Sequence, residues 1–117
     1  MNLMTITPDP AYTDQSIILN LTVWGVTKRV TLDFRYADKT DKWYMSLRDM
    51  QTNEVYFTNV PALCSYGEVA NNLWEPFWSK GIGMLCCFPN VSKPSTVDPS
   101  KDNLNEFLFV WGDGVVE

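Results

Sequence analysis

The chain has 117 residues, of which 45% are hydrophobic and 20% charged, a composition typical of one soluble globular domain. No apolar run approaches the ~18 residues that a membrane span requires. With 9 basic and 14 acidic residues, the net charge of −5 disfavours nucleic acid and anionic membranes as partners. Histidine is absent, which excludes the Ser-His-Asp triad, the Cys-His dyad and histidine-ligated zinc.

The first half of the chain alternates apolar and polar residues with a period of two, as half-buried strands do. Four segments show this pattern, at residues 16–24, 29–36, 43–48 and 54–60, and short turn-rich segments separate them. Within the first segment, Ile17 and the alternate residues up to Val23 are expected to face the core. The spacing predicts four consecutive strands in an antiparallel meander.

The pattern changes after residue 60. Residues 61–80 lose the alternation and are predicted to be irregular, with at most a short helical turn over residues 68–73. Residues 81–88 are apolar on both faces, which favours a central strand or one covered by an interface. Residues 89–103 are rich in proline and serine and predict a long loop that carries contacts or is mobile. Residues 105–111 close the domain as a last strand.

About six strands and no amphipathic helix predict an all-β fold, a small antiparallel barrel or sandwich. A single β domain over residues 1–117 is expected, with residues 1–14 as an extended N-terminal segment and residues 15–112 as the core. The choice between barrel and sandwich stays open because periodicity does not reveal strand pairing across residues 61–80. The N-terminal residues have neither the basic nor the apolar region of a signal peptide.

Neither a metal site, a cofactor nor an enzymatic activity is expected. The three cysteines are an odd number, and Cys86 and Cys87 are neighbours that form no unstrained disulfide in an extended strand. Together with Cys64 they lack C-x-x-C spacing and a fourth soft ligand, so buried reduced thiols are expected. A carboxylate pair for glycoside hydrolysis could come from the acidic set Asp33, Asp38, Asp41, Asp49 and Glu54. Most acidic residues of the first half lie in or beside predicted turns, however, where solvated aspartates are common.

Five Trp, five Tyr and six Phe are more aromatic residues than a domain of this size can bury completely. A cluster of them surrounds Pro76. It could form a sugar-stacking platform, a protein-contact patch or a plug over one end of a barrel, and protein contact or core capping is favoured. The predicted partner-contact residues are Tyr66, Trp74, Phe77, Trp78, Pro94 and Trp111.

The order of these elements resembles the baseplate plug family, small all-β proteins of contractile-tailed bacteriophages, typified by a cyanophage baseplate. The resemblance rests on the hairpin through Val23-Trp24-Gly25-Val26 and on the aromatic strand Trp43-Tyr44-Met45-Ser46-Leu47. It continues through residues 54–60, the glycine-initiated strand 81–88 and the closing strand 107–111. The similarity covers roughly residues 6–112 and consists of hydrophobicity and turn patterns.

This resemblance implies a virion structural protein of the tail baseplate. Such a protein would act as a plug-like component at the central hub, sealing or connecting the distal end of the tail tube before genome ejection. Its implied partners are baseplate hub and tail-tube proteins, with copies of the chain placed around the tail axis, after assembly in the bacterial host cytoplasm. Two alternatives remain: a carbohydrate-binding module that stacks sugars on Trp74 and Trp78, and a cell-wall hydrolase that uses Asp33 and Glu54.

Overall fold

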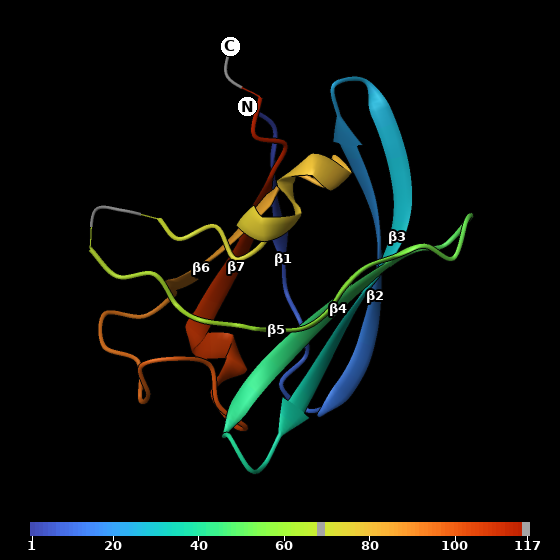
Figure 1. Ribbon diagram of the computed structural model, residues 1–117. Coiled ribbons are helices and arrows are strands. Elements are labelled where there is room, and N and C mark those ends of the chain that lie inside the picture. Colours follow the sequence, from blue (N-terminus) through green and yellow to red (C-terminus); the bar gives the residue numbers. More distant parts are fainter. Residues whose placement is uncertain (68–69, 116–117) are drawn as a thin grey trace.

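Two antiparallel sheets face each other in the computed structural model, which describes residues 1–67 and 70–115 (Figure 1). The larger sheet has the strand order β2-β3-β4-β5 and the smaller sheet the order β1-β7-β6. The predicted all-β fold is therefore confirmed. Among the described residues no ladder joins the two sheets, so the fold is a sandwich and not a barrel.

The larger sheet is the predicted meander. A two-residue turn of Trp24 and Gly25, both with positive φ (52° and 76°), joins its first two strands and suits the twist of a hairpin. The last pairing is irregular, with register shifts on either side of Leu47. The strands of this sheet are β2 (Asp14–Val23), β3 (Val26–Ala37), β4 (Lys42–Asp49) and β5 (Val55–Pro61).

The smaller sheet contains a strand that the sequence pattern did not predict. It consists of β1 (Leu3–Ile6), β6 (Met84–Pro89) and β7 (Phe107–Gly112). Strand β1 lies within the segment expected to be merely extended, yet it pairs with β7 from the other end of the chain, and Ile6 is buried in the core. Four residues are too few to show a periodicity, so this strand is defined by its partner. The described residues thus form seven strands where about six were predicted.

Strand β6 lies at the edge of its sheet, and β7 is the central strand. The segment that follows β5 covers this edge. The backbone N–H groups of Ser65 and Leu73 donate to the carbonyls of Cys87 (2.7 Å) and Leu85 (2.8 Å). The edge position of β6 corrects the prediction of a central strand, and the alternative of a strand covered by an interface stays a prediction.

The irregular segment was predicted correctly, but its helical turn was misplaced. A 3₁₀ helix, η1, spans Glu75–Lys80, and a second, η2, spans Leu104–Glu106 before β7. Residues 70–73 are not helical, and residues 68–69 of the predicted turn lie outside the described residues. Pro76 suits the start of η1 because its missing N–H has no helical partner at that position.

The core fills the space between the sheets. Phe34 of β3 and Phe109 of β7 meet there edge to face, with ring centroids 5.3 Å apart. Trp43 and Trp74 are fully buried in the same cluster. In both sheets the side chains that face the core are every second residue of a strand.

Candidate docking surface

The outer face of the smaller sheet is apolar. Every second side chain of each strand points away from the core. None of these outward side chains is charged, and only Thr5 among them is polar. They are Leu3 and Thr5 of β1, Met84, Cys86 and Phe88 of β6, and Leu108, Val110 and Gly112 of β7. We call these eight residues the small-sheet face.

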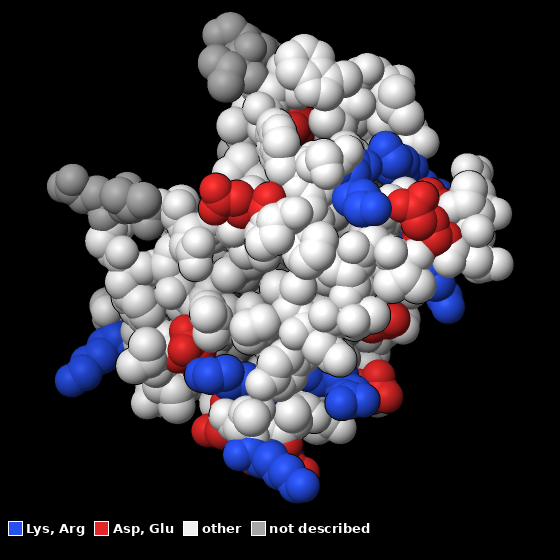
Figure 2. All heavy atoms as spheres, in the orientation of Figure 1, with Lys and Arg blue, Asp and Glu red and all other residues white. Residues whose placement is uncertain are grey.

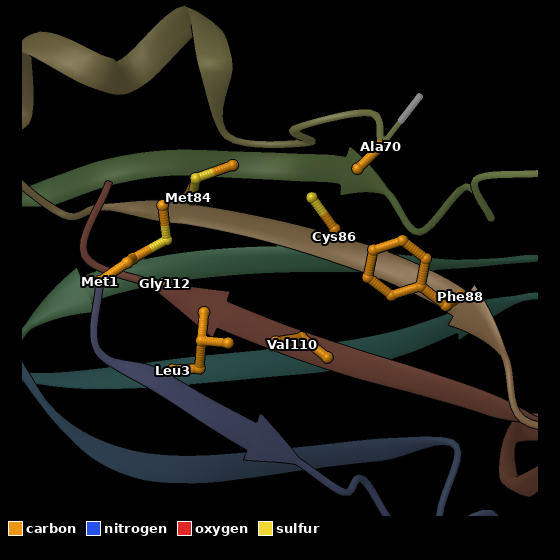
Figure 3. A pocket seen from close by; sticks show the side chains of 8 residues that line it. All are labelled: Met1, Leu3, Ala70, Met84, Cys86, Phe88, Val110 and Gly112. Carbon is orange, nitrogen blue, oxygen red and sulfur yellow. The ribbon is translucent and has the colours of Figure 1, made fainter. Parts of the chain in front are cut away.

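The small-sheet face is hollowed and partly open to solvent. Leu3 is 68% exposed, and Met84, Phe88 and Val110 are half-buried. Figure 3 shows side chains from all three strands around a pocket of about 210 Å³. Met1 and Ala70 also line this pocket, one from the start of the chain and one from the segment that covers the β6 edge. Leu3 and its half-buried neighbours are the part of this face that is open to solvent, and apolar surface left open to solvent is a candidate interaction site.

The outer face of the larger sheet has the opposite character. Arginines occupy outward positions on β3 and β4, at Arg29, Arg35 and Arg48, and Asp33 lies between the first two. Serine, threonine and asparagine fill most of the other outward positions. This is the pattern expected of an antiparallel sheet with one solvated face.

The predicted aromatic cluster is divided between the core and the surface. Trp74 has no exposed surface and packs against Phe57, with ring centroids 5.4 Å apart. The ring of Phe77 stacks on the ring of Phe57, with centroids 4.9 Å apart, and Phe77 is half-buried. Trp78 is half-exposed and lies against Gly114, where an added Cβ would overlap its ring. The prediction of Trp74 as a contact residue is therefore corrected, because a ring without exposed surface stacks on neither a sugar nor a partner.

Trp111 is also a core residue, and its prediction as a contact is corrected too. It points inward from β7, and its indole Nε1–H donates to the carbonyl of Ile82 at 2.7 Å. Tyr66 and Pro94 lie together instead, in a shallow pocket formed with residues of the long loop. Of the predicted contact residues, Trp74 and Trp111 thus lie in the core and Phe77 is half-buried beside it. Tyr66 and Pro94 lie together next to the long loop, and Trp78 lies at the surface beside Gly114.

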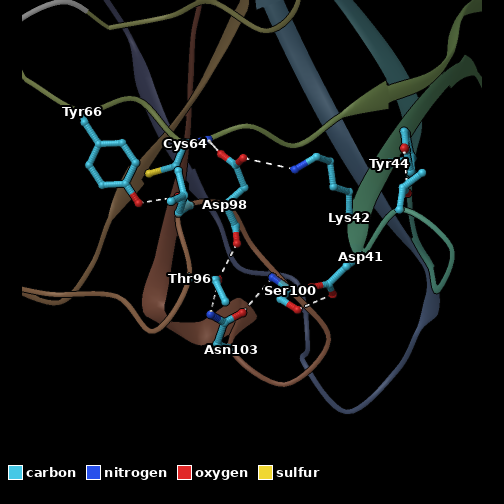
Figure 4. A network of polar contacts seen from close by, with 11 residues as sticks. Asp41, Lys42, Tyr44, Cys64, Tyr66, Thr96, Asp98, Ser100 and Asn103 are labelled. Carbon is cyan, nitrogen blue, oxygen red and sulfur yellow. Dashed lines mark hydrogen bonds and ion pairs between the residues drawn. The ribbon is translucent and has the colours of Figure 1, made fainter.

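A network of polar contacts anchors the long loop of residues 89–103 (Figure 4). The Asp98 carboxylate accepts the backbone N–H of Cys64 at 2.8 Å and pairs with Lys42 at 3.3 Å. The Trp43 indole N–H donates to the carbonyl of Ser100 at 2.7 Å. The Tyr66 hydroxyl donates to the carbonyl of Val97. Partial burial and the neighbouring Cys64 thiol raise the pKa of Tyr66 to about 12, so this donor stays protonated at neutral pH.

Charged groups gather away from the middle of the side formed by β5 and η1. Figure 2 shows that this side is largely uncharged at its centre, while Lys, Arg, Asp and Glu gather in one group at the upper right and in another toward the lower end, near the β3–β4 turn. Among them, the Asp41 carboxylate accepts hydrogen bonds from Ser100 and Tyr36, which lower its pKa. The charges at this end therefore serve to hold turns and the loop in place.

The carboxylates proposed for hydrolysis are not brought together by the sheet register. Asp33 pairs with Ser46, while Glu54 precedes β5 and its carbonyl accepts the backbone N–H of Asp49. Spacings of ~3.3 Å per residue and ~4.8 Å per strand put the two Cα atoms about 14 Å apart. The carboxyl groups of glycosidases lie roughly 5 to 9.5 Å apart.

Asp49 was interpreted as a solvated turn residue, and it is a turn residue but a buried one. The backbone N–H of Thr52, the Tyr56 hydroxyl and the backbone N–H of Gln51 donate to its carboxylate and hold its pKa below the usual range. These bonds close the β4–β5 turn. Asp49 is therefore a structural residue.

The prediction of buried thiols is confirmed for two of the three cysteines, whereas Cys64 is only half-buried. All three are free, and Cys86 and Cys87 are buried on opposite faces of β6. Burial raises the pKa of each thiol, most strongly for Cys87, so the thiols are neutral and weakly nucleophilic near pH 7. Residues 1–67 and 70–115 contain no group of three metal-binding side chains. The helices of the same residues are all too short or too polar to cross a membrane.

No family model and no curated protein matches the chain. The small-sheet face thus stands on its geometry alone. Sequence reasoning offered an interface as one of two explanations for the apolar faces of residues 81–88, but it did not connect that surface with residues 107–111 or with the N-terminal strand.

Proposed function

We propose that this protein is a structural component of a multiprotein assembly and that it docks through the small-sheet face. The observation that carries the proposal is an outer sheet face without a charged side chain, opposite a larger sheet whose outer face is charged. Burying such a face against a partner removes apolar surface from water at about 25 cal/mol per Å². The absence of charge means that no ionised group of this face has to be desolvated on docking.

The resemblance to the baseplate plug family identifies the proposed assembly as the tail baseplate of a contractile-tailed bacteriophage. In that setting the protein is a plug-like part of the central hub that seals or connects the distal end of the tail tube until genome ejection. Hub and tail-tube proteins are its proposed partners, and copies repeat around the tail axis. Tyr66, Phe77, Trp78 and Pro94 stay predicted as further contacts.

Two features support a docking role. The long loop is held down by Asp98 and Ser100, so the domain offers a preformed shape, and preformed surfaces lose less conformational entropy on binding. The pocket on the small-sheet face is lined almost entirely by apolar groups, and such pockets accept apolar anchor residues of a partner.

The test is incorporation of the protein into purified phage particles, measured by mass spectrometry. The unaltered chain should be present in stoichiometric amounts with hub and tail-tube proteins. Leu3→Asp and Leu108→Asp place a charge on the small-sheet face and should lower incorporation at least about tenfold, the effect of 1.4 kcal/mol. Val55→Asp is the matched control, because Val55 is an apolar residue that is 54% exposed on the other sheet.

Three results would count against the proposal. Absence of the unaltered protein from particles would remove the baseplate assignment. Normal incorporation of both small-sheet variants would remove the docking face while leaving the assembly in place. A loss with Val55→Asp equal to that of Leu3→Asp would show that the effect is not specific to the small-sheet face.

A further inference from the structure

The free edge of β2 is the longest unprotected strand edge among the described residues. Strand β2 has ten residues, contains no proline and pairs only with β3. The edge strand β1 has four residues and is followed by Pro8, and the β6 edge is covered by the segment after β5. A long uncovered edge presents a row of unpaired N–H and C=O groups, which bind another strand.

The register identifies which backbone groups face outward. Val23 and Val26 flank the two-residue turn and form a hydrogen-bonded pair, and such pairs recur at every second residue. At the other end of the ladder the N–H of Tyr36 donates to the carbonyl of Thr13 at 2.8 Å. Thr13 is odd-numbered like Val23, so the hydrogen-bonding pattern is the same at both ends. The odd-numbered residues of β2 therefore bond to β3. The even-numbered residues present their backbone groups to the free edge, where no described residue bonds to them: Asp14, Ser16, Ile18, Asn20 and Thr22.

The side chains along this edge lack the usual protection against pairing. Residues 15–23 carry no charge, although lysine or proline commonly blocks an edge. Ile18, at the middle of the outer face, is 54% exposed. On the inner face Ile17 and Leu19 are only half-buried, because no strand lies beyond them to cover the rim of the core.

We propose that β2 pairs with β2 of a second copy of this chain, antiparallel, about a two-fold axis at Ile18. This register joins the two larger sheets into one continuous sheet. All five outward-facing residues then find a backbone partner, because Ser16 lies opposite the partner's Asn20 and Asp14 opposite the partner's Thr22. The half-buried Ile17 lies beside the partner's Leu19, so the open rims of the two cores cover each other.

The charges of the neighbouring strand complement each other in this register. Asp33 lies beside Ser16, and Arg29 lies beside Asn20. One row of side chains across the joined sheet therefore contains, in order, Asp33, Ser16, the partner's Asn20 and the partner's Arg29. Asp14 is the only ionised residue of β2, and it faces an uncharged threonine. No like charges stand directly opposite each other, an arrangement that would destabilise the pair.

The exposed aromatic residues at the two ends of β2 agree with the same register. Tyr12, 62% exposed, precedes the strand, and Trp24, 73% exposed, follows it. Antiparallel pairing centred on Ile18 brings the Trp24 end of one copy to the Tyr12 end of the other. A second copy is the occupant because the edge is complementary to itself, in hydrogen-bond phase, in charge and in the placement of these aromatics. The pairing uses a different surface from the small-sheet face and does not depend on the proposed function.

The first experiment follows amide hydrogen exchange by NMR at increasing protein concentration, with sedimentation equilibrium to record the mass. The amides of Ser16, Ile18 and Asn20 should gain protection as the dimer forms. The amides of Leu19 and Leu21 bond to β3 and should be protected at every concentration. A monomer over the whole range, with rapid exchange at the even-numbered residues, overturns the proposal. Protection of these residues only when another protein is added also overturns it, in favour of a foreign strand.

The second experiment changes the centre of the edge. Ile18→Lys places two like charges at the two-fold axis and should raise the dissociation constant of the dimer at least about tenfold. Val97→Lys is the control, because it makes a similar change at a position that is 71% exposed in the long loop. Protection of Leu19 and Leu21 reports that the variant is folded. An unchanged dimer in folded Ile18→Lys overturns the β2 interface.

Discussion

The two sheets of this sandwich have similar inner faces and contrasting outer faces. Both inner faces carry large aromatic and aliphatic side chains, and Phe34 and Phe109 meet between them. On the outside, the larger sheet carries several charged side chains, among them three arginines, whereas the small-sheet face carries no charge. The packing of the two inner faces against each other stabilises the fold, because both sheets contribute to one core. The outer faces differ in charge, and an uncharged face is the one that a partner can cover without desolvating an ionised side chain.

The largest effect is expected where the two sheets meet. Phe34→Ala and Phe109→Ala each remove one ring of the edge-to-face pair and should lower the free energy of unfolding by about 3 to 5 kcal/mol. The double variant should lose less than the sum, because the second substitution no longer breaks the contact. Urea denaturation of the three variants measures this. Strictly additive losses, or a small loss for one residue alone, would show that the sheets do not share one core.

The second largest effect is expected at low pH, which should destabilise the larger sheet before the smaller one. The pKa of Asp49 is lower in the folded than in the unfolded chain, so its stabilising effect is full above the unfolded value near 3.8. This stabilisation is lost as the pH falls through the folded pKa. We expect Asp49→Asn to be less stable than the unaltered protein at pH 7 and to depend less on pH below about 4.

The measurement for Asp49 is thermal unfolding from pH 7 to pH 2, with Asp38→Asn as the control for removing an exposed turn carboxylate from the same sheet. Amide exchange near pH 3 should show the β4–β5 turn opening before the ladder of β6 and β7. Equal pH dependence in Asp49→Asn and the unaltered chain would contradict this assignment.

The smallest effect on stability is expected at the outer faces, where binding should change instead. A fluorescent dye that binds apolar surface should bind the native protein at the small-sheet face, and Leu108→Asp should remove most of that fluorescence. Val55→Asp makes the same kind of charge change at a position of the larger sheet that is 54% exposed, and it should leave the dye signal intact. Equal loss in both variants, or dye binding that survives Leu108→Asp, would erase the contrast between the faces.

Local patterning was sufficient for the larger sheet. Its first three strands alternate apolar and polar residues, and the connections contain turn residues such as Gly25 and Asn53, so strands that are neighbours in sequence are also neighbours in space. The loop of residues 89–103 was equally visible from its prolines and serines. That the loop is anchored was not visible, because its anchors Trp43 and Cys64 are distant in sequence.

The errors have a common cause. Strand β1 and the positions of Trp74 and Trp111 all depend on pairing between segments that are far apart in the chain. An aromatic residue in an irregular segment has the same local sequence whether it is exposed or buried. Only the packing of Phe57 against it decides that Trp74 belongs to the core.

The sequence by itself determined the all-β class, the larger sheet, the reduced cysteines and the lack of histidine chemistry, since these follow from composition and from periodicity within a strand. Tertiary structure alone decided that the fold is a sandwich, that β7 and not β6 is the central strand, and which aromatic residues are exposed. It also decided that the second apolar face of β6 and β7 lies on the surface. The physical reason is that alternation specifies which side chains share a face of a strand, whereas contacts between distant segments determine what covers that face.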